Sequence, residues 1–480
     1  MTKLIELTAL RIVAALRAQE ISPHDLLDAL EQRIGKFDQL VNALPVLCFE
    51  RARSVADRLM KIPVEDRGLL CGLPVPIKDL DNVQGVLTSH GSLHLADNIA
   101  PENCYMVDRL ENEGAVIYAK SNTPEFGAGG NTFNDMFGPT RNPRNLNLSA
   151  AGSSGGAAAA LASGTAWLAQ GSDNAGSLRS PASFCGVVGL RPTPGRVVRG
   201  PAVNPYQILL SNGPMARNVE DVAFLLDAMV SEDLRDPGSM PQPCTSFLAT
   251  AQARRKPRKV AYSPDLGITP VDPEIAEICR RAALQFESMG IEVEEASPDF
   301  SGVHESYQTI RAHEFSLSLS NLSEATLAGL KPELAENLEK GRMLTFDGIS
   351  RATQTRGNIR RRVMQFFKSY DLLLTPATIV APYPVENRFV DSCNGIEFDT
   401  YIDWLSIAYA ITLVSLPALS LPCGYTQSGM PVGLQMIGRA HGEAELLTSA
   451  LVLEEALALD LRPIEPQSDC TDLVAAIGGK

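Results

Sequence analysis

The feature that most narrows the possible fold is the alternation of helix-like and strand-like segments between residues 68 and 230. Residues 107–113 have a helical pattern and are followed by a β-like run at 115–118. Residues 155–169 are rich in alanine and favour a helix, whereas residues 185–190 resemble a strand. Helices that alternate with short strands pack in layers on a sheet. The alternation therefore predicts an α/β fold built around a layered sheet.

Composition argues for a large core and against nucleic acid as a partner. The chain has 480 residues, of which 45% are hydrophobic, and its formal net charge is −14 at pH 7. An acidic chain lacks the basic surface that nucleic-acid binding requires. The longest basic cluster, at residues 254–259, precedes an apolar run, and we interpret it as a solvated linker.

The cysteines and the apolar runs bear on the compartment. Nine cysteines, an odd number without a Cys-x-x-Cys pair, are typical of reduced, mostly buried thiols in a cytoplasmic protein. The first residues lack the apolar centre of a signal peptide. The longest apolar run, 411–423, is shorter than the ~20 residues that span a bilayer, and Pro417 and Pro422 interrupt it. We expect a cytoplasmic protein with no membrane partner.

We divide the chain into an N-terminal helical region at 1–65, a core at 66–230, a variable helical or inserted region at 231–370, and a C-terminal part of the same fold at 371–480. Residues 4–60 are predicted to be helical. Ser22 is a typical helix cap, since Pro23 and Asp25 follow it in the first turn. Further strands are predicted at 259–262, 291–294, 371–374 and 418–422, and further helices at 273–290 and 443–459.

Three segments of the core carry candidate catalytic side chains. Lys78 lies in Pro76-Ile77-Lys78-Asp79, Ser153 in Gly152-Ser153-Ser154-Gly155-Gly156, and Ser177 in Asn174-Ala175-Gly176-Ser177-Leu178-Arg179. A serine hydroxyl is a weak nucleophile unless a base takes its proton. Here a lysine and a second serine could supply that function without a histidine.

Lys78 follows an apolar segment in which Leu73, Val75 and Ile77 alternate with other residues. A lysine considered alone is usually a surface residue, but this alternation predicts a partly buried strand. Burial disfavours the charged form and lowers the pKa of a lysine toward neutrality, as a general base requires.

Ser177 considered alone would be a turn or cap residue. Its segment, however, has small residues at 175 and 176, which allow a tight bend that points several N–H groups into one concavity. Such a nest of donors is what an oxyanion hole requires.

Three other readings of these motifs are weaker. A phosphate-binding loop would need a lysine where Ala157 follows Gly155-Gly156. Residues 152–156 also match Gly-x-Ser-x-Gly, with Ser154 as nucleophile, but the preceding segment is polar and turn-like, and His304, His313 and His441 lack supporting context. His90 and His94 without a matching acid or cysteine are weak evidence for metal, so no metal site is predicted.

The chain closely resembles the amidase signature family, and the resemblance covers most of residues 20–458. Besides the three catalytic segments, it extends over the family-like motifs at 72–79, 120–127, 137–143, 185–193, 213–217, 374–376, 421–424 and 429–439. The resemblance implies a single large α/β/α layered domain with a mixed central β-sheet. It also implies that neither a metal nor an organic cofactor is needed.

The resemblance assigns roles residue by residue. Ser177 would be the acyl-forming nucleophile, and Lys78 would be the base. Ser153 would relay protons, and in the family this serine follows a cis peptide bond. Backbone N–H groups of residues 174–177, that is Asn174, Ala175, Gly176 and Ser177, would hold the oxyanion. Structural support would come from Asp173, Arg179 and Ser154.

The sequence departs from the family pattern in three places. Ala175 replaces the first glycine of the common Gly-Gly-Ser, which is tolerable only at negative φ. Ala150-Ala151-Gly152 stands where Pro-Gly-Gly is common, and Thr412 takes the place of a frequent asparagine. None of these changes removes a catalytic group.

The resemblance implies an amidase that hydrolyses a small-molecule carboxylic amide, and a homodimer is left open. One alternative is the glutaminase component (the A subunit) of a tRNA-dependent amidotransferase, which releases ammonia from glutamine. Leu405 stands where its glutamine-binding Asp is expected, and Asp403 lies two positions away. The other alternative is an inert scaffold of the same fold. We expect substrate-pocket walls from 200–212, 300–350 and 383–405, with Tyr206, Phe315, Tyr383 and Trp404 as candidates.

Overall fold

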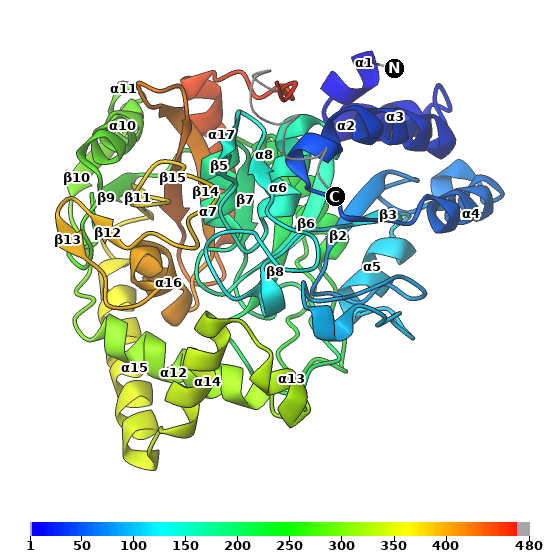
Figure 1. Ribbon diagram of the computed structural model, residues 1–480. Helices are drawn as coiled ribbons and strands as arrows, with labels where there is room; N and C mark the ends of the chain where they lie inside the picture. The colour runs from blue at the N-terminus through cyan, green and yellow to red at the C-terminus, as the bar shows by residue number, and fades with distance from the viewer. Residues whose placement is uncertain (1, 468–480) are drawn as a thin grey trace.

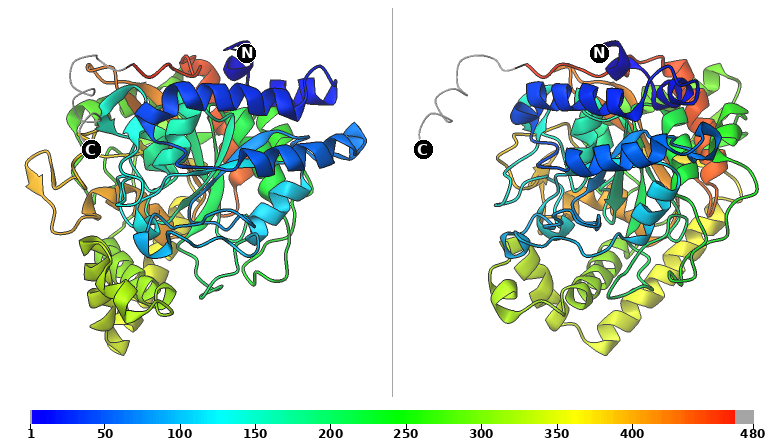
Figure 2. Two further views of the ribbon diagram at one scale, coloured as in Figure 1. Left: turned by 45° about the vertical axis from the view of Figure 1, so that its right-hand side comes forward. Right: turned by 90° about the vertical axis from the view of Figure 1, so that its right-hand side faces the viewer.

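The computed structural model describes residues 2–467 and shows one α/β domain (Figures 1 and 2). The helices are α1 (Thr2–Glu6), α2 (Ala9–Arg17), α3 (Pro23–Val41), α4 (Phe49–Met60), α5 (Tyr105–Asn112), α6 (Gly155–Ser163), α7 (Arg179–Cys185), α8 (Val219–Met229), α9 (Phe247–Gln252), α10 (Pro273–Ala283), α11 (Gln285–Ser288), α12 (Val303–Ser318), α13 (Glu324–Ala328), α14 (Pro332–Arg342), α15 (Phe346–Phe366), α16 (Ser406–Leu413) and α17 (Glu443–Leu457). The strands are β1 (Val46–Leu47), β2 (Pro74–Lys78), β3 (Val116–Ser121), β4 (Arg141–Asn142), β5 (Asn145–Ser149), β6 (Leu168–Asp173), β7 (Val188–Arg191), β8 (Ser211–Ala216), β9 (Lys259–Tyr262), β10 (Glu292–Glu295), β11 (Leu372–Pro376), β12 (Ser392–Cys393), β13 (Ile396–Glu397), β14 (Ala418–Tyr425) and β15 (Pro431–Ile437).

The main sheet has eight strands in the order β10-β9-β11-β15-β14-β7-β8-β6. β9 pairs in parallel with β10 and β11, and the other neighbours pair antiparallel, so the mixed sheet predicted from the resemblance is confirmed. A second sheet, β1-β3-β2, lies beside it, because β2 contacts β6.

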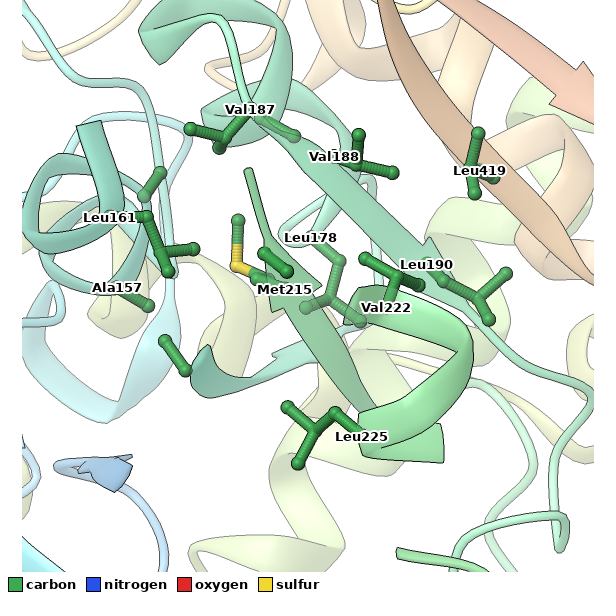
Figure 3. Close-up of a cluster of buried hydrophobic side chains, with 14 of the residues drawn as sticks. Ala157, Leu161, Leu178, Val187, Val188, Leu190, Met215, Val222, Leu225 and Leu419 are labelled. Carbon is green, nitrogen blue, oxygen red and sulfur yellow. The ribbon is translucent and has the colours of Figure 1, made fainter. Parts of the chain in front are cut away.

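Helices from both halves of the chain bury the main sheet. α6 and α7 contact β6, β7, β14 and β15, while α8, α9 and α17 pack on one another and on β7, β8 and β14. Figure 3 shows part of the resulting core, where Leu161 of α6, Met215 of β8 and Leu225 of α8 lie together, all with no exposed surface. Leu419 of β14 joins the same core from a segment some 200 residues further along the chain. Sequence-distant segments therefore share one core.

Local sequence signals explain several boundaries that were predicted correctly. Ser22 caps α3 in a reciprocal capping box with Asp25, and Pro23 occupies the first turn, as predicted. The strand at 259–262 and the helix that begins at Pro273 are also confirmed.

Other boundaries were wrong. The helix predicted for 155–169 ends at Ser163, because Gly164 adopts a left-handed conformation (φ 73°) and caps it; β6 then occupies Leu168–Asp173. The strand predicted from 185 begins only at Val188, since Cys185 ends α7 and Gly186 is its left-handed cap. The short strand β1 interrupts the helices of 4–60 and pairs with β3, a long-range contact that local propensity does not encode.

Of the nine cysteines, Cys470 lies outside the described residues, and six of the eight described ones are buried. Between residues 2 and 467 no helix combines the length and apolarity needed to cross a membrane.

Candidate active site

The three candidate catalytic residues come from three different elements. Lys78 is the last residue of β2, in the small sheet, and its backbone N–H donates to Gln170 Oε1 on β6 at 3.0 Å. Ser153 follows a cis Gly152–Ser153 peptide bond just before α6, and Ser177 lies in the turn between β6 and α7. The packing of β2 against β6 brings the lysine to both serine-bearing loops.

Lys78 has no exposed surface, whereas the sequence predicted only partial burial. Within the described chain its Nζ contacts three hydroxyls and no carboxylate: Ser153 Oγ at 2.7 Å, Ser154 Oγ at 2.9 Å and Ser172 Oγ at 3.1 Å. Burial lowers the pKa of Lys78 to about 7, and the charges of Asp81 and Asp173 offset only part of that effect. Burial therefore makes the neutral form of Lys78, which has a free lone pair, accessible near neutral pH.

Ser153 and Ser177 both line a cavity of about 450 Å³. They are nearly buried, with exposed fractions of 3% and 8%. Among residues 2–467 the Ser177 hydroxyl has no hydrogen-bond partner within 3.5 Å. Of the two hydroxyls, that of Ser177 is therefore the one without a hydrogen bond to the described chain, and it is accessible from the cavity.

Ser154 is placed differently from its neighbour. Its hydroxyl contacts Lys78 and donates to the Ser172 carbonyl at 3.2 Å, and its backbone N–H donates to the Ser177 carbonyl at 3.2 Å. Ser154 therefore ties the two serine loops together. No histidine hydrogen-bonds to it within the described part of the chain, so the Gly-x-Ser-x-Gly reading gains no support.

Asp173 organises the turn that carries Ser177. Its carboxylate accepts from the backbone N–H groups of Gly176 (3.0 Å) and Leu178 (3.1 Å) and pairs with Arg179 Nη2 at 2.8 Å. Burial alone would raise the pKa of Asp173, but Arg179 and Arg191 hold this pKa well below its usual range. The turn is thus built on a permanently ionised, fully buried carboxylate.

This arrangement refines the expected oxyanion hole. The Gly176 N–H already donates to Asp173, which leaves the N–H groups of Asn174, Ala175 and Ser177 as available donors. Ala175 has a negative φ, as its methyl group requires, and Gly176 takes the left-handed conformation at φ 104°. The replacement of glycine by Ala175 is therefore compatible with the turn.

Two residues of the site were missed in the sequence. Ser172 adds a third hydroxyl to Lys78, and only its place in Gly171-Ser172-Asp173 could have indicated it. Tyr307 of α12 donates its hydroxyl to Asn174 Oδ1 at 2.7 Å and stacks on Tyr409, with ring centroids 4.1 Å apart. Tyr307 lies 133 positions from Asn174, and no local pattern could have indicated their contact.

The cavity walls correct our expectation about the substrate pocket. The apolar part is lined by Leu80, Leu95, Phe126, Val203, Leu210, Phe315, Leu319 and Leu322. Of the four candidate wall residues only Phe315 is among the lining residues of the described chain. Tyr206 is 76% exposed, while Tyr383 and Trp404 pack edge-to-face on each other, with Trp404 fully buried and Tyr383 against the main core. Residues of 200–212 and 300–350 line this cavity, as expected, but none of the described residues 383–405 does.

Comparison with known proteins shows the family of this chain. The family model described as Amidase matches residues 25–447. An acylamidase from Rhodococcus erythropolis is 34% identical over 475 residues, which is 98% of this chain and 98% of that protein. The A subunit of the glutamyl-tRNA(Gln) amidotransferase from Moorella thermoacetica is 34% identical over 480 residues, 95% of this chain and 97% of its own.

Solved structures agree as well. A bacterial aryl acylamidase of the amidase signature family superposes with a TM-score of 0.88 at 26% identity and covers 94% of this chain and 96% of its own. A 6-aminohexanoate cyclic dimer hydrolase complexed with substrate gives 0.87 at 27% identity, over 96% and 99% of the two chains. With its Gly-Ser-rich loops, its layered mixed sheet and these full-length matches, the chain belongs to the amidase signature family of amide hydrolases.

Proposed function

We propose that this protein hydrolyses a carboxylic amide through an acyl-enzyme on Ser177. The observation that carries the proposal is the 2.7 Å contact between Lys78 Nζ and Ser153 Oγ, at the wall of a cavity that Ser177 also lines. The pKa of Lys78, lowered to about 7 by burial, makes the lysine an effective base near neutral pH.

We infer the proton path from the Lys78–Ser153 contact and from the position of Ser177 in the wall of the same cavity. Neutral Lys78 takes the proton of Ser153, and Ser153 takes that of Ser177 as the Ser177 oxygen attacks the amide carbonyl. The N–H groups of Asn174, Ala175 and Ser177 stabilise the oxyanion. When the C–N bond breaks, Ser153 gives a proton to the leaving amine and regains one from protonated Lys78. Water then cleaves the acyl ester by the same relay and releases the carboxylic acid.

The cavity favours amides that have an apolar chain and no ammonium group over glutamine. Its lining within residues 2–467 contains neither aspartate nor glutamate, so the ammonium group of glutamine would have no counter-charge there. The Asp403 carboxylate is already occupied, because Gln308 Nε2 and the Thr400 N–H donate to it at 2.7 and 2.8 Å. We therefore favour an acylamidase-like activity, as in the Rhodococcus relative, over the ammonia release of a glutaminase component.

The first test is covalent labelling of the purified chain. A fluorophosphonate should modify Ser177, as located by peptide mass spectrometry, and the Ser177→Ala variant should lose both labelling and amide hydrolysis by ~10³-fold or more. Ser154→Ala, which changes the neighbouring hydroxyl, should keep the label on Ser177. An adduct on Ser154 would refute the assignment, and an unlabelled chain would favour the inert scaffold. A screen of aliphatic and aryl amides, with glutamine tested in parallel, separates an acylamidase-like activity from a glutaminase activity.

The second test concerns Ser153 as proton donor. Ser153→Ala should slow amide hydrolysis by ~10²–10⁴-fold, the usual range for general acid–base help. An ester of the same acyl group should suffer less, because an alkoxide leaves more readily than an unprotonated amine. The measurement is the amide-to-ester ratio of kcat/KM in Ser153→Ala and in the parent, and an unchanged ratio would remove Ser153 from the relay.

A further inference from the structure

One cation stands in the wall of the catalytic cavity without a role in the proposed chemistry. Arg199 follows β7 and lines the 450 Å³ cavity together with Ser153 and Ser177. Among the described residues that line the cavity it is the one lysine or arginine, and none of them is an acid. A guanidinium group in such a wall is a fixed positive charge facing an otherwise largely apolar space.

The contacts of Arg199 leave this charge without a close counter-ion. Its Nη1 donates to the Gln207 carbonyl at 3.2 Å and its Nη2 to Gln207 Oε1 at 3.3 Å, both longer than the ~2.7–2.9 Å typical of charge-assisted hydrogen bonds. Asp236 accepts the backbone N–H of Arg199, at 2.8 Å, rather than its side chain. Between residues 2 and 467 no carboxylate oxygen lies within 4.0 Å of the guanidinium nitrogens.

The two preceding arginines of the same segment behave differently. Arg191 lies 3.5 Å from the Asp173 carboxylate, and Arg196 lies 3.3 Å from Glu443. Burial lowers the pKa of Arg199, and the charges of Asp81, Asp236 and Glu314 offset only part of that effect. An anionic ligand group would supply the missing partner and would gain a two-pronged, charge-assisted contact.

A neighbouring cavity limits where that anion can bind. It measures about 200 Å³ and is also lined by Asp81. It shares six lining residues with the catalytic cavity: Leu80, His90, Ser172, Arg199, Ala202 and Leu210. The Asp81 carboxylate accepts from Gln170 at 3.0 Å and from Asn212 at 3.3 Å. Its negative charge would repel a second carboxylate, so the anionic group belongs on the side of Arg199 that faces the larger cavity.

We propose that Arg199 is a specificity-determining residue that binds a carboxylate carried by the amide substrate. The preferred substrates then carry an apolar chain together with a carboxylate on either the acyl or the amine side of the scissile amide. Monoamides of dicarboxylic acids and N-acyl amino acids share this chemistry. The inference rests on the proposed amide hydrolysis for the cleavage step, but the recognition itself is a property of binding.

Binding is therefore measured first, on the Ser177→Ala protein, by calorimetry with two matched pairs of ligands. The pairs are adipamic acid against neutral adipamide, and N-hexanoylglycine against N-hexanoylglycinamide, which distinguish a carboxylate on the acyl side from one on the amine side. At least one acid should bind about 10- to 100-fold more tightly than its neutral partner, the range expected for a hydrogen-bonded charge pair.

Arg199→Met in the same background should abolish this preference, and Arg199→Lys, which keeps the charge but not the fork of donors, should keep part of it. Arg258→Met is the matched control, because the Arg258 side chain is 82% exposed and lies outside this cavity; it should keep the preference of the parent. In the enzyme with Ser177, the acid-to-neutral ratio of kcat/KM should change in the same order.

Equal binding of acid and neutral ligands in both pairs would overturn the assignment of Arg199, whatever the hydrolytic activity. A preference that survives in folded Arg199→Met would overturn it as well. A carboxylate preference that depends on Arg199, together with absent hydrolysis and absent labelling of Ser177, would support the recognition and refute the proposed function instead.

Discussion

At the scale of single residues, Lys78 and Lys120 show how contacts decide what a buried lysine can do. Both are fully buried, and burial lowers the pKa of each. Lys120 Nζ lies 3.3 Å from the Asp79 carboxylate and donates to Thr88 Oγ1, so its charge is paired. In the described structure Lys78 meets only hydroxyl groups and a backbone carbonyl, at 3.5 Å from Ser172 O. Without a carboxylate at this distance the charge of Lys78 is unpaired, which is what the proposed role of a base requires.

The first prediction concerns the pH dependence of the rate. kcat/KM for an amide should rise as the pH passes through about 7, where Lys78 loses its proton, and then level off. Lys78→Ala should lose most activity at every pH. A profile that stays flat from about pH 5 to 9, with chemistry shown to be rate-limiting, would contradict lysine as the base.

The same pKa shift has a consequence for stability. In the unfolded chain Lys78 returns to a pKa near 10.5, so between pH 7 and 10.5 the unfolded state binds more protons than the folded one. Stability attributable to Lys78 therefore increases with pH across this window. Relative to Lys78→Met, the free energy of unfolding of the parent in urea should rise by at most about 3 kcal/mol from about pH 7 to 9.5.

At the scale of elements, the turn between β6 and α7 depends on one left-handed glycine. A Cβ on Gly176 would lie 2.6 Å from Ala408 Cβ and 2.9 Å from Ser180 Oγ. Gly85 has a comparable positive φ of 75°, but a Cβ there would meet nothing within 4 Å. An alanine at Gly85 therefore introduces backbone strain alone, whereas an alanine at Gly176 also displaces the turn that carries Ser177.

The second prediction uses this pair. Gly176→Ala should shift the turn that carries Ser177 and lower kcat by ~10²-fold or more, since small misplacements of reacting groups have large kinetic effects. Gly85→Ala should lose about 1 kcal/mol of stability from the positive φ and keep its kcat. Steady-state kinetics and urea unfolding of both variants provide the check. Equal kcat values in the two variants would show that the turn tolerates the methyl group.

The elements themselves were partly readable in the sequence. The Ser22 cap and the alternation of helix and strand are local signals, and they predicted α3 and the α/β class correctly. The end of α6 was missed because Gly164 and the short segment after it were included in an alanine-rich helix. The prediction that Tyr383 and Trp404 line the substrate pocket was wrong, because the size and polarity of an aromatic side chain do not determine which cavity it faces.

At the scale of the whole molecule, a second small core lies against the catalytic cavity. It consists of Ala128, Leu319, Leu330, Leu334 and Leu338 and is separate from the main core. It packs α14 and the end of α12 on the loop that contains Phe126, and these helices project below the main sheet (Figure 1). The Lys331 N–H also donates to Glu125 Oε2 at 3.0 Å. One wall of the cavity thus depends on this small core.

The third prediction compares the two cores. Leu334 and Leu161 are both fully buried, and truncating a buried leucine to alanine typically costs about 2–5 kcal/mol. Leu334→Ala should loosen α13 and α14, raise KM, and speed limited proteolysis between residues 315 and 345. Leu161→Ala, in the main core of Figure 3, should lower Tm with little change in KM. An unchanged KM in Leu334→Ala would show that substrate binding does not depend on the small core.

What the sequence determined by itself is local: the glycine turns, the caps, and the residue types Lys78, Ser153 and Ser177 in their motifs. Those features depend on neighbouring residues, so they can be read along the chain. The catalytic roles of these residues and the domain boundaries at 65, 230 and 370 stay predictions.

Only the tertiary structure decided the electrostatics and the cavity. The pKa of Lys78 depends on its burial between two sheets, and its hydroxyl partner Ser153 lies 75 positions away. The contact of Tyr307 with Asn174 joins residues 133 positions apart. The charge of Arg199 is distinctive only because no acid of the described chain lines the same cavity. Desolvation and cavity lining are properties of the packed chain, since they arise from which distant segments exclude water from one another.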